Sequence, residues 1–440
     1  MGRLVVGTGF VEDARTDDGG TGWWSQRLAW FARPGDVMVL PVEPDQDYLS
    51  YVGELTGVDP ASWRVVVAPP GEGANNVLTS ERLGSDALRD ALLAVLRHHP
   101  VDEVFTPWPD RAVARLTDRL GLRSIHAGRG FLEQSGGHLM VSKATFRAVA
   151  AGNGVPIPPG AVIGTAADAV DITDRLLREH EVVMLKQEWG LGGRGNDILS
   201  TVDGVRPLGA PRVVRINGRA DLERYFAEHW SWLSSEDRST PVAEQYFPDS
   251  AAYFIEFAIS DDGVRRVCDG EQLNAPLPAG FVLPAPAMPP SARAVLDETG
   301  LRLAEVARAM GYRGYFGPDG ILTADQEPMY TEWNGRMGGV THVMEGVGRR
   351  VVGPAYQRDR VILDLVWTSG WSASSFEDVR ERVARAGLGY DRERREGVVL
   401  TTPFAELTGV MYCVVAADAD RAWEINGRLA ELFSPVALPA

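Results

Sequence analysis

The fold of this chain is decided by residues 319–336, which read DGILTADQEPMYTEWNGR. Strand-forming residues lie on both sides of a polar turn at 324–327, which predicts an antiparallel β-hairpin. If the turn is centred between Asp325 and Gln326, Asp319 and Glu332 face each other across the hairpin. Two directly opposed carboxylates repel each other unless a cation lies between them. The hairpin therefore predicts a cation site.

Glu332, Asn334 and Arg336 share one parity, so in an extended strand they project from the face that also carries Asp319. Two carboxylates and an amide oxygen form a hard-oxygen site for Mg²⁺, which completes its coordination with nucleotide phosphates. Arg336 would then lie where a transferring phosphoryl group needs a fixed hydrogen-bond donor. The alternative is a solvated hairpin with paired charges.

Lysine occurs only at Lys143 and Lys186, and the other 42 of the 44 Lys and Arg residues are arginine. This bias suggests that lysine persists where a compact ammonium group is required, for example against phosphate oxygens. Lys186 ends a predicted strand that begins at 182, and a glycine-rich loop at 190–196 follows it. Backbone N–H groups of such a loop can close over an anion. The alternative is a glycine hairpin without a ligand.

The loop contains the string G-x-G-x-x-G, at Gly190, Gly192 and Gly195. A dinucleotide fold would place this string between a first strand and a helix, whereas here a strand is predicted at 197–200. A protein kinase has its lysine after the glycine loop, and neither lysine is preceded by the glycine of a Walker A motif. The context therefore argues against these three kinds of nucleotide site.

A further segment, residues 241–250, leaves a predicted sheet in extended form and offers backbone groups to a flat heterocycle. Together with the capped helix that opens at Ser142 and Lys143, these segments follow the order found in the ATP-grasp superfamily of carboxylate-amine ligases. The chain resembles that superfamily over about residues 141–350. At finer grain, residues 331–342, TEWNGRMGGVTH, are similar to peptide ligases of the pheganomycin-biosynthesis type.

The resemblance implies roles for individual residues. It implies an ATP-binding set made of Lys143, Lys186, Gly190, Gly192, Gly193, Arg194, Gly195, Glu244, Gln245, Tyr246, Phe247 and Asp249, a Mg²⁺ set made of Asp319, Glu332 and Asn334, and catalytic roles for Arg336, Lys186 and Lys143. The lysines would contact the α- and β-phosphates, and Arg336 would contact the γ-phosphate and an acyl phosphate. Residues 244–247 would form the hinge that binds adenine, largely through backbone groups. Many relatives have a glutamate for the ribose soon after this hinge, and here Asp249 or Ser250 stands in its place.

The implied reaction activates a carboxylate with ATP as an acyl phosphate, releases ADP, and joins the acyl group to an amine with loss of phosphate. The finer resemblance implies an α-guanidino acid and the N-terminus of a peptide as substrates, in antibiotic biosynthesis. Glu256, Asp269 and Glu271 are candidate partners for a guanidinium or ammonium group, with an outward strand face and a loop as the alternative. A small-molecule kinase and a non-catalytic ATP-binding scaffold are the competing functions.

The fold class that we predict is α/β, with an ATP-grasp core. Short apolar strands at 4–6, 37–40, 65–67 and 101–105, separated by helical patterns, indicate an open parallel sheet. We expect a pre-ATP-grasp domain at 1–140, a central lid subdomain at 141–247, a second subdomain with the Mg²⁺ site at 248–365 and a small separate α/β domain at 366–440. Irregular segments are expected at 203–219 and, because of its prolines, at 276–290.

The composition of the chain argues for some classes of protein and against others. The 440 residues carry a net charge of −16, and 45% of them are hydrophobic, as in a globular protein of several domains. The acidic balance argues against a nucleic-acid partner, and the absence of a long apolar run argues against a membrane span. Two cysteines, Cys268 and Cys413, favour the cytoplasm. The oligomeric state stays open, with a homo-oligomer as one option, as does the role of the acidic stretch at 17–20.

Overall fold

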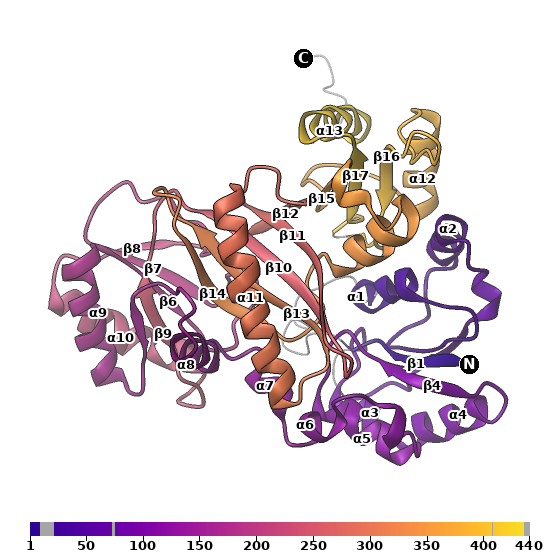
Figure 1. Cartoon of the computed structure of the whole chain (residues 1–440), viewed down its shortest axis with the longest axis horizontal. Helices are drawn as coiled ribbons and strands as arrows, with labels where there is room; N and C mark the ends of the chain where they lie inside the picture. Colours follow the sequence, from indigo (N-terminus) through magenta and orange to yellow (C-terminus); the bar gives the residue numbers. More distant parts are fainter. Residues whose placement is uncertain (9–21, 73–74, 407, 435–440) are drawn as a thin grey trace.

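The computed structural model describes residues 1–8, 22–72, 75–406 and 408–434, and the acidic stretch at 17–20 lies outside these ranges. The described strands form three sheets. Figure 1 shows the sheet of the expected lid at one end of the molecule and the N-terminal and C-terminal parts side by side at the other. No helix in the described ranges combines the length and the apolar character that crossing a bilayer requires.

The N-terminal sheet is parallel throughout, as its buried apolar strands predict. Its order is β3-β2-β1-β4. The strands are β1 (Gly2–Val6), β2 (Val37–Leu40), β3 (Arg64–Val67) and β4 (Val101–Phe105), and the helices of this part are α1 (Trp23–Gln26), α2 (Gln46–Thr56), α3 (Ser80–Gly84), α4 (Asp86–Leu96), α5 (Arg111–Arg119), α6 (Arg129–Glu133) and α7 (Gly136–Leu139), with 3-10 helices at Arg27–Phe31, Pro60–Ser62 and Arg123–Ile125. The prediction of an open α/β unit is confirmed.

The second sheet has five strands in the order β5-β9-β6-β7-β8. These are β5 (Gly160–Val162), β6 (Val182–Lys186), β7 (Asn196–Ser200), β8 (Val213–Arg215) and β9 (Val242–Gln245), accompanied by α8 (Lys143–Gly152), α9 (Ala166–His180) and α10 (Arg219–Leu233). Ser142 caps α8 by accepting from the Thr145 N–H, as expected from its side chain. β8 falls in the segment 203–219 for which we expected irregular structure, so that expectation is wrong at 213–215.

The third sheet is antiparallel and has eight strands in the order β14-β13-β10-β11-β12-β15-β17-β16. Its strands are β10 (Ala251–Ile259), β11 (Val264–Asn274), β12 (Pro278–Leu283), β13 (Gly314–Leu322), β14 (Pro328–Asn334), β15 (Val361–Leu365), β16 (Gly397–Leu400) and β17 (Tyr412–Ala416), and the helices are α11 (Pro290–Met310), α12 (Phe376–Arg385) and α13 (Ala419–Phe433), with a π-helix at Val343–Val352 and a 3-10 helix at Tyr356–Arg358.

Two features of this sheet differ from expectation. β12 lies in the proline-rich segment 276–290, where no strand was expected, and its only proline, Pro278, takes the first position, where a missing N–H is tolerated. β15 pairs with both β12 and β17, so the strands near the C-terminus continue the same sheet. The C-terminal part therefore adds to the central sheet instead of forming a separate one.

The N-terminal and C-terminal parts share one hydrophobic core. Trp30 is fully buried, and its indole N–H donates to the Thr401 carbonyl at 3.1 Å. The Tyr48 hydroxyl donates to the same carbonyl at 2.9 Å. Two buried aromatic residues from the start of the chain thus fix a loop near its end, which places the N-terminal part against the central sheet.

Replacement of Trp30 by alanine should lower the free energy of unfolding by about 3–5 kcal/mol, because it removes a buried aromatic ring and one hydrogen bond. Urea unfolding followed by circular dichroism measures this change. The control is Trp423→Ala, whose ring is 45% exposed and should cost less than about 1 kcal/mol. Equal losses in the two variants would contradict the shared core.

Candidate functional site

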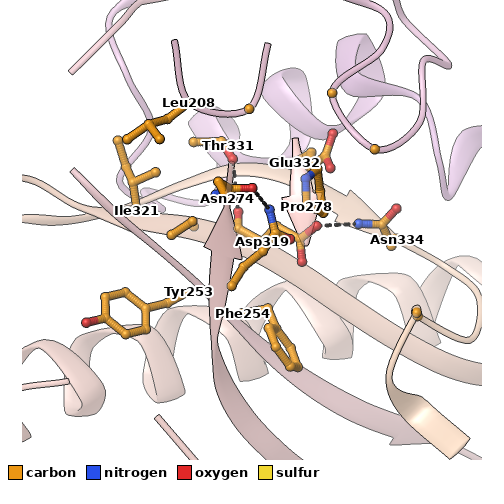
Figure 2. Close-up of a pocket in the computed structure, with 18 of the residues that line it drawn as sticks. Leu208, Tyr253, Phe254, Asn274, Pro278, Asp319, Ile321, Thr331, Glu332 and Asn334 are labelled. Atoms are coloured by element: carbon orange, nitrogen blue, oxygen red, sulfur yellow. Dashed lines mark hydrogen bonds between the residues drawn. The ribbon is translucent and has the colours of Figure 1, made fainter. Parts of the chain in front are cut away.

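One cavity of about 420 Å³ lies between the five-stranded and the eight-stranded sheets. Most of the residues that the sequence singled out line it: Lys143, Lys186, Gly190, Gly192, Gly193, Glu244, Gln245, Tyr246, Phe247, Asp319, Glu332, Asn334 and Arg336. Figure 2 shows Asp319, Glu332 and Asn334 close together on the hairpin, with Leu208 and Ile321 further along the wall. Segments from 143 to 336 thus meet around a single space.

Asp319 lies directly opposite Glu332, as predicted, but the turn is not centred where the prediction placed it. The pairs next to the turn, from Gly320 with Tyr330 to Leu322 with Pro328, are centred on Asp325, and a one-residue shift brings Asp319 opposite Glu332. A bulge follows immediately, between Asp319 and Gly320. The Asn334 side-chain N–H donates to Asp319 Oδ2 at 2.8 Å, and the Arg336 guanidinium donates to Asn334 Oδ1 at 2.7 Å. The four polar side chains therefore form one connected group on one face.

The two carboxylates of this group differ in their electrostatics. Burial and the charge of Glu332 raise the pKa of Asp319 well above its ordinary value. Burial also works to raise the pKa of Glu332, but the ammonium groups of Lys143 and Lys186 outweigh it and hold that pKa low, at about 2. The pair therefore resists carrying two negative charges, and a divalent cation between the carboxylates would remove this resistance.

These residues fit a magnesium ion. In the described part of the chain no cluster of three or more His, Cys, Asp or Glu side chains forms a metal site, so the set depends on two carboxylates and one amide. Asp319 and Glu332 supply anionic oxygens that face each other. Asn334 points its amide nitrogen at Asp319 and its oxygen at Arg336, so its amide must turn over to act as a ligand through oxygen.

Both lysines of the chain reach this cavity, and both are almost fully buried. Lys143 Nζ lies 2.9 Å from Glu332 Oε2 and donates to the Gly190 carbonyl at 2.7 Å. Lys186 Nζ lies 2.5 Å from Glu244 Oε1. The Lys143 ammonium group therefore lies between Glu332 and the glycine loop, whereas the Lys186 ammonium group lies between Glu244 and the Thr331 carbonyl, 3.4 Å away.

Glu244 is one of the residues expected at the adenine, and its side chain has a further role. Glu244 is 2% exposed and pairs with Lys186 on one oxygen and with Arg147 Nη1, at 2.8 Å, on the other. Arg147 also donates to the Pro158 carbonyl at 3.0 Å. Glu244 thus neutralises and orients Lys186, and its backbone lies between the paired strands β5 and β6.

The neighbouring hinge residues are partly committed to the sheet. The Gln245 N–H donates to the Pro159 carbonyl at 2.7 Å, and the Tyr246 N–H donates to the Val182 carbonyl at 3.0 Å. The Tyr246 hydroxyl donates to the Arg206 carbonyl at 2.8 Å. These bonds hold the strand end at the cavity wall and leave Phe247 at its mouth.

The glycine loop between β6 and β7 is held by backbone bonds of its own. The Asn196 N–H donates to the Gly193 carbonyl at 3.1 Å, and the Gln187 N–H donates to the Gly195 carbonyl at 2.8 Å. Gly193 has φ +74°, and a Cβ there would stand 2.6 Å from the Gly209 carbonyl oxygen. Only glycine fits at this point of the loop.

Three of the singled-out residues do not line the cavity: Arg194, Gly195 and Asp249. Asp249 is exposed, whereas Ser250, the other candidate for the ribose, is at the cavity wall. Of the three acidic candidates for a substrate cation, Glu256 alone lines the cavity, while Asp269 pairs with Arg266 and Arg293.

Sequence reasoning missed two partners of the site. Arg147 lies one turn after Lys143 on α8 and reaches Glu244, which is 97 residues away in the chain. Trp108, from the N-terminal part, packs its ring under the Arg336 guanidinium at 4.9 Å. The spacing of Lys143 and Arg147 by four residues places both on one helix face and could have indicated Arg147, but nothing local indicates Trp108.

Comparisons with known proteins agree with this architecture. The pre-ATP-grasp domain family matches residues 25–122, and the family described as the PGM1 C-terminal domain matches residues 378–429. The N-terminal match and the arrangement of two sheets around a lysine-lined cavity identify the fold. The chain has the ATP-grasp fold. No curated protein sequence matches the chain.

Solved structures show the same ATP-grasp architecture over nearly the whole chain. Biotin carboxylase from Campylobacter jejuni is 12% identical, with a TM-score of 0.58 over 98% of this chain and 91% of that one. N5-carboxyaminoimidazole ribonucleotide synthetase from Thermus thermophilus is 14% identical, with a TM-score of 0.57 over 99% and 100%. L-amino acid ligase from Bacillus licheniformis is 14% identical, with a TM-score of 0.54 over 100% and 99%.

Replacement of Arg147 by methionine should lower the free energy of unfolding by about 3 kcal/mol, because Glu244 loses one of two buried cationic partners. Urea unfolding followed by tryptophan fluorescence measures the loss. Arg178→Met is the control, since the Arg178 side chain is 74% exposed in its ion pair with Asp174 and should contribute less than about 1 kcal/mol. If Arg147→Met lowers the free energy of unfolding as little as Arg178→Met does, the buried ion pair does not stabilise the site.

Proposed function

We propose that this chain is an ATP-dependent carboxylate-amine ligase. The proposal rests above all on one observation: the only two lysines of the sequence both reach the cavity that contains the opposed carboxylates of the hairpin. The ATP-grasp fold supports it, because the similar structures include a biotin carboxylase, a carboxyaminoimidazole ribonucleotide synthetase and an amino acid ligase, some of them solved with ATP or ADP. ATP and Mg²⁺ are the proposed nucleotide and metal.

In this proposal each group of the cavity has a task that its position supports. Lys143 and Lys186 bind phosphate oxygens, and Arg336 orients the γ-phosphate while the substrate carboxylate attacks it in line. A magnesium ion held by Asp319, Glu332 and Asn334 would supply charge neutralisation. The glycine loop 190–196, with Arg194 and Gly195 at its end, covers the phosphates and keeps water from the acyl phosphate. The hinge 244–247 binds adenine, and Asp249 or Ser250 contacts the ribose.

The substrate classes are a carboxylic acid and the N-terminal amine of a peptide, and an α-guanidino acid is the acid that we propose. The resemblance of residues 331–342 to peptide ligases of the pheganomycin-biosynthesis type supports this choice. The likeness of the fold to an L-amino acid ligase is consistent with it. The protein would then act in the biosynthesis of a peptide natural product in the cytoplasm.

Nucleotide product analysis with Mg·ATP, a panel of amino and guanidino acids, and hydroxylamine as amine acceptor tests this function. ADP together with a hydroxamate, both dependent on one acid, is the expected result. ADP with a stable phosphorylated product would indicate a small-molecule kinase instead. AMP, or the absence of acid-dependent turnover with every acid, would overturn the ligase proposal.

Glu332→Gln should reduce acid-dependent ADP formation at least about 100-fold, because the change removes an anionic ligand of the proposed metal and the ion pair with Lys143. A coupled assay for ADP at saturating ATP measures the rate. Glu298→Gln is the control, since this glutamate is 73% exposed on α11 and should keep the full rate. Near-normal turnover by Glu332→Gln would refute the assignment of the metal site.

A further inference from the structure

Part of the cavity wall consists of residues that we assign neither to the nucleotide nor to the metal. These residues include Phe254, Glu256, Phe281 and Gly338. Phe254 and Phe281 meet edge to face with ring centroids 5.6 Å apart, so this part of the wall is largely apolar. Glu256, on β10, has its carboxylate among these apolar side chains, next to the site proposed for phosphoryl transfer.

Glu256 is 2% exposed and is held by only one of its two oxygens. The Thr341 hydroxyl donates to Glu256 Oε2 at 2.7 Å, and the Gly338 N–H donates to the Thr341 oxygen at 2.7 Å. Oε1 has no hydrogen-bond partner within the described ranges. Buried polar oxygens are normally hydrogen-bonded, so Oε1 has the capacity to accept a hydrogen bond from a bound group.

The backbone at Gly338 also approaches the Glu256 carboxylate closely. A Cβ on Gly338 would lie 3.3 Å from Glu256 Oε2 and 3.5 Å from Thr341 Oγ1. The chain between Arg336 and Thr341 thus wraps the glutamate tightly and ties its position to that of Arg336. The carboxylate and the guanidinium that we assign to the acyl phosphate are therefore fixed relative to each other.

The charges around Glu256 suit a proton acceptor. Burial raises its pKa to about 8, while the hydrogen bond from Thr341 and the charge of Arg336 oppose the rise and the charge of Glu345 adds to it. The N-terminal ammonium of a peptide has a pKa of about 8. Proton transfer from such an ammonium to Glu256 would therefore cost little free energy.

We propose that Glu256 binds the ammonium group of the amine substrate through Oε1 and takes its proton before the amine attacks the acyl phosphate. This inference rests on the proposed ligase function. It assigns the part of the cavity around Glu256 to the amine substrate, and it makes Glu256 the general base of the second half-reaction. Thr341 is the positioning residue that holds the other oxygen.

The step balances in atoms and charge. One proton moves from the ammonium nitrogen to Glu256, which becomes neutral, and the freed lone pair attacks the acyl carbon. The C–N bond forms, the bond between the acyl carbon and the phosphate oxygen breaks, and the second proton of the nitrogen leaves with phosphate. Glu256 then returns its proton to water.

The test compares two amine acceptors in the same variant. Hydroxylamine is largely uncharged at neutral pH and needs no base, whereas a short peptide such as triglycine presents an ammonium group. The full chain is assayed with the acid that supports hydroxamate formation, and hydroxamate and amide are each quantified. Glu256→Gln removes the base and keeps the shape, and Glu298→Gln is the control, since Glu298 is 73% exposed on α11 and is absent from the cavity wall.

We expect Glu256→Gln to lower kcat/KM for the peptide at least about 100-fold and to leave hydroxamate formation within about threefold. Glu298→Gln should change neither rate by more than about threefold. Equal losses with both acceptors would show that Glu256 has a structural role and would overturn the proposal, as would an unchanged rate with the peptide. If the wild-type protein forms no hydroxamate with any of the acids tested, the proposed ligase function is refuted, and this inference is refuted with it.

A second variant tests the proposed role of Glu256 if circular dichroism shows that Glu256→Gln does not fold. Thr341→Val keeps the carboxylate and removes the hydrogen bond that positions it. The peptide rate should then fall about tenfold relative to the hydroxamate rate, because a misplaced base acts less efficiently. An unchanged ratio of the two rates in Thr341→Val would overturn the proposal.

Discussion

The opposition of Asp319 and Glu332 across the hairpin is the constraint around which the site is built. Two partly buried carboxylates that face each other are costly unless cations surround them. Lys143 stands beside Glu332, and the Arg336 guanidinium reaches Asp319 through Asn334. The buried charges of the cavity are thereby matched before any ligand binds, so a nucleotide with its metal would meet groups already in place.

The eight-stranded sheet makes these positions rigid relative to each other. The hairpin lies at one edge of the sheet, and β10, which carries Glu256, pairs directly with β13. The backbone ladder therefore fixes the distance between the proposed phosphoryl-transfer site and the proposed base. The N-terminal part completes the site from outside the sheet, because Trp108 packs on Arg336 and the Pro107 carbonyl accepts from the Met337 N–H at 2.9 Å.

Features that depend on residues close together in the sequence were predicted, and features that depend on residues far apart in the sequence were missed. The hairpin itself was predictable because it depends on one turn within 18 residues of chain. Its register was predicted correctly only beyond Asp319, because a turn pattern does not reveal the bulge between Asp319 and Gly320. β12 was missed because a proline-rich segment is typical of a loop. The only proline of this strand, Pro278, occupies its first position, where proline is tolerated. The pairing of β15 with β17 was missed because a strand pattern does not name its partner.

The amino-acid sequence alone was enough to predict the residue types of the candidate site and the local elements that carry them: two lysines, two carboxylates on a hairpin, and a glycine loop after a strand. Only the tertiary structure decided which charges meet. Glu244 joins Lys186 and Arg147, and Glu256 receives one bond from Thr341, 85 residues away, and keeps one oxygen bare. The physical reason is that residue type and periodicity express short-range preferences, whereas the partner of a buried charge depends on how distant segments pack.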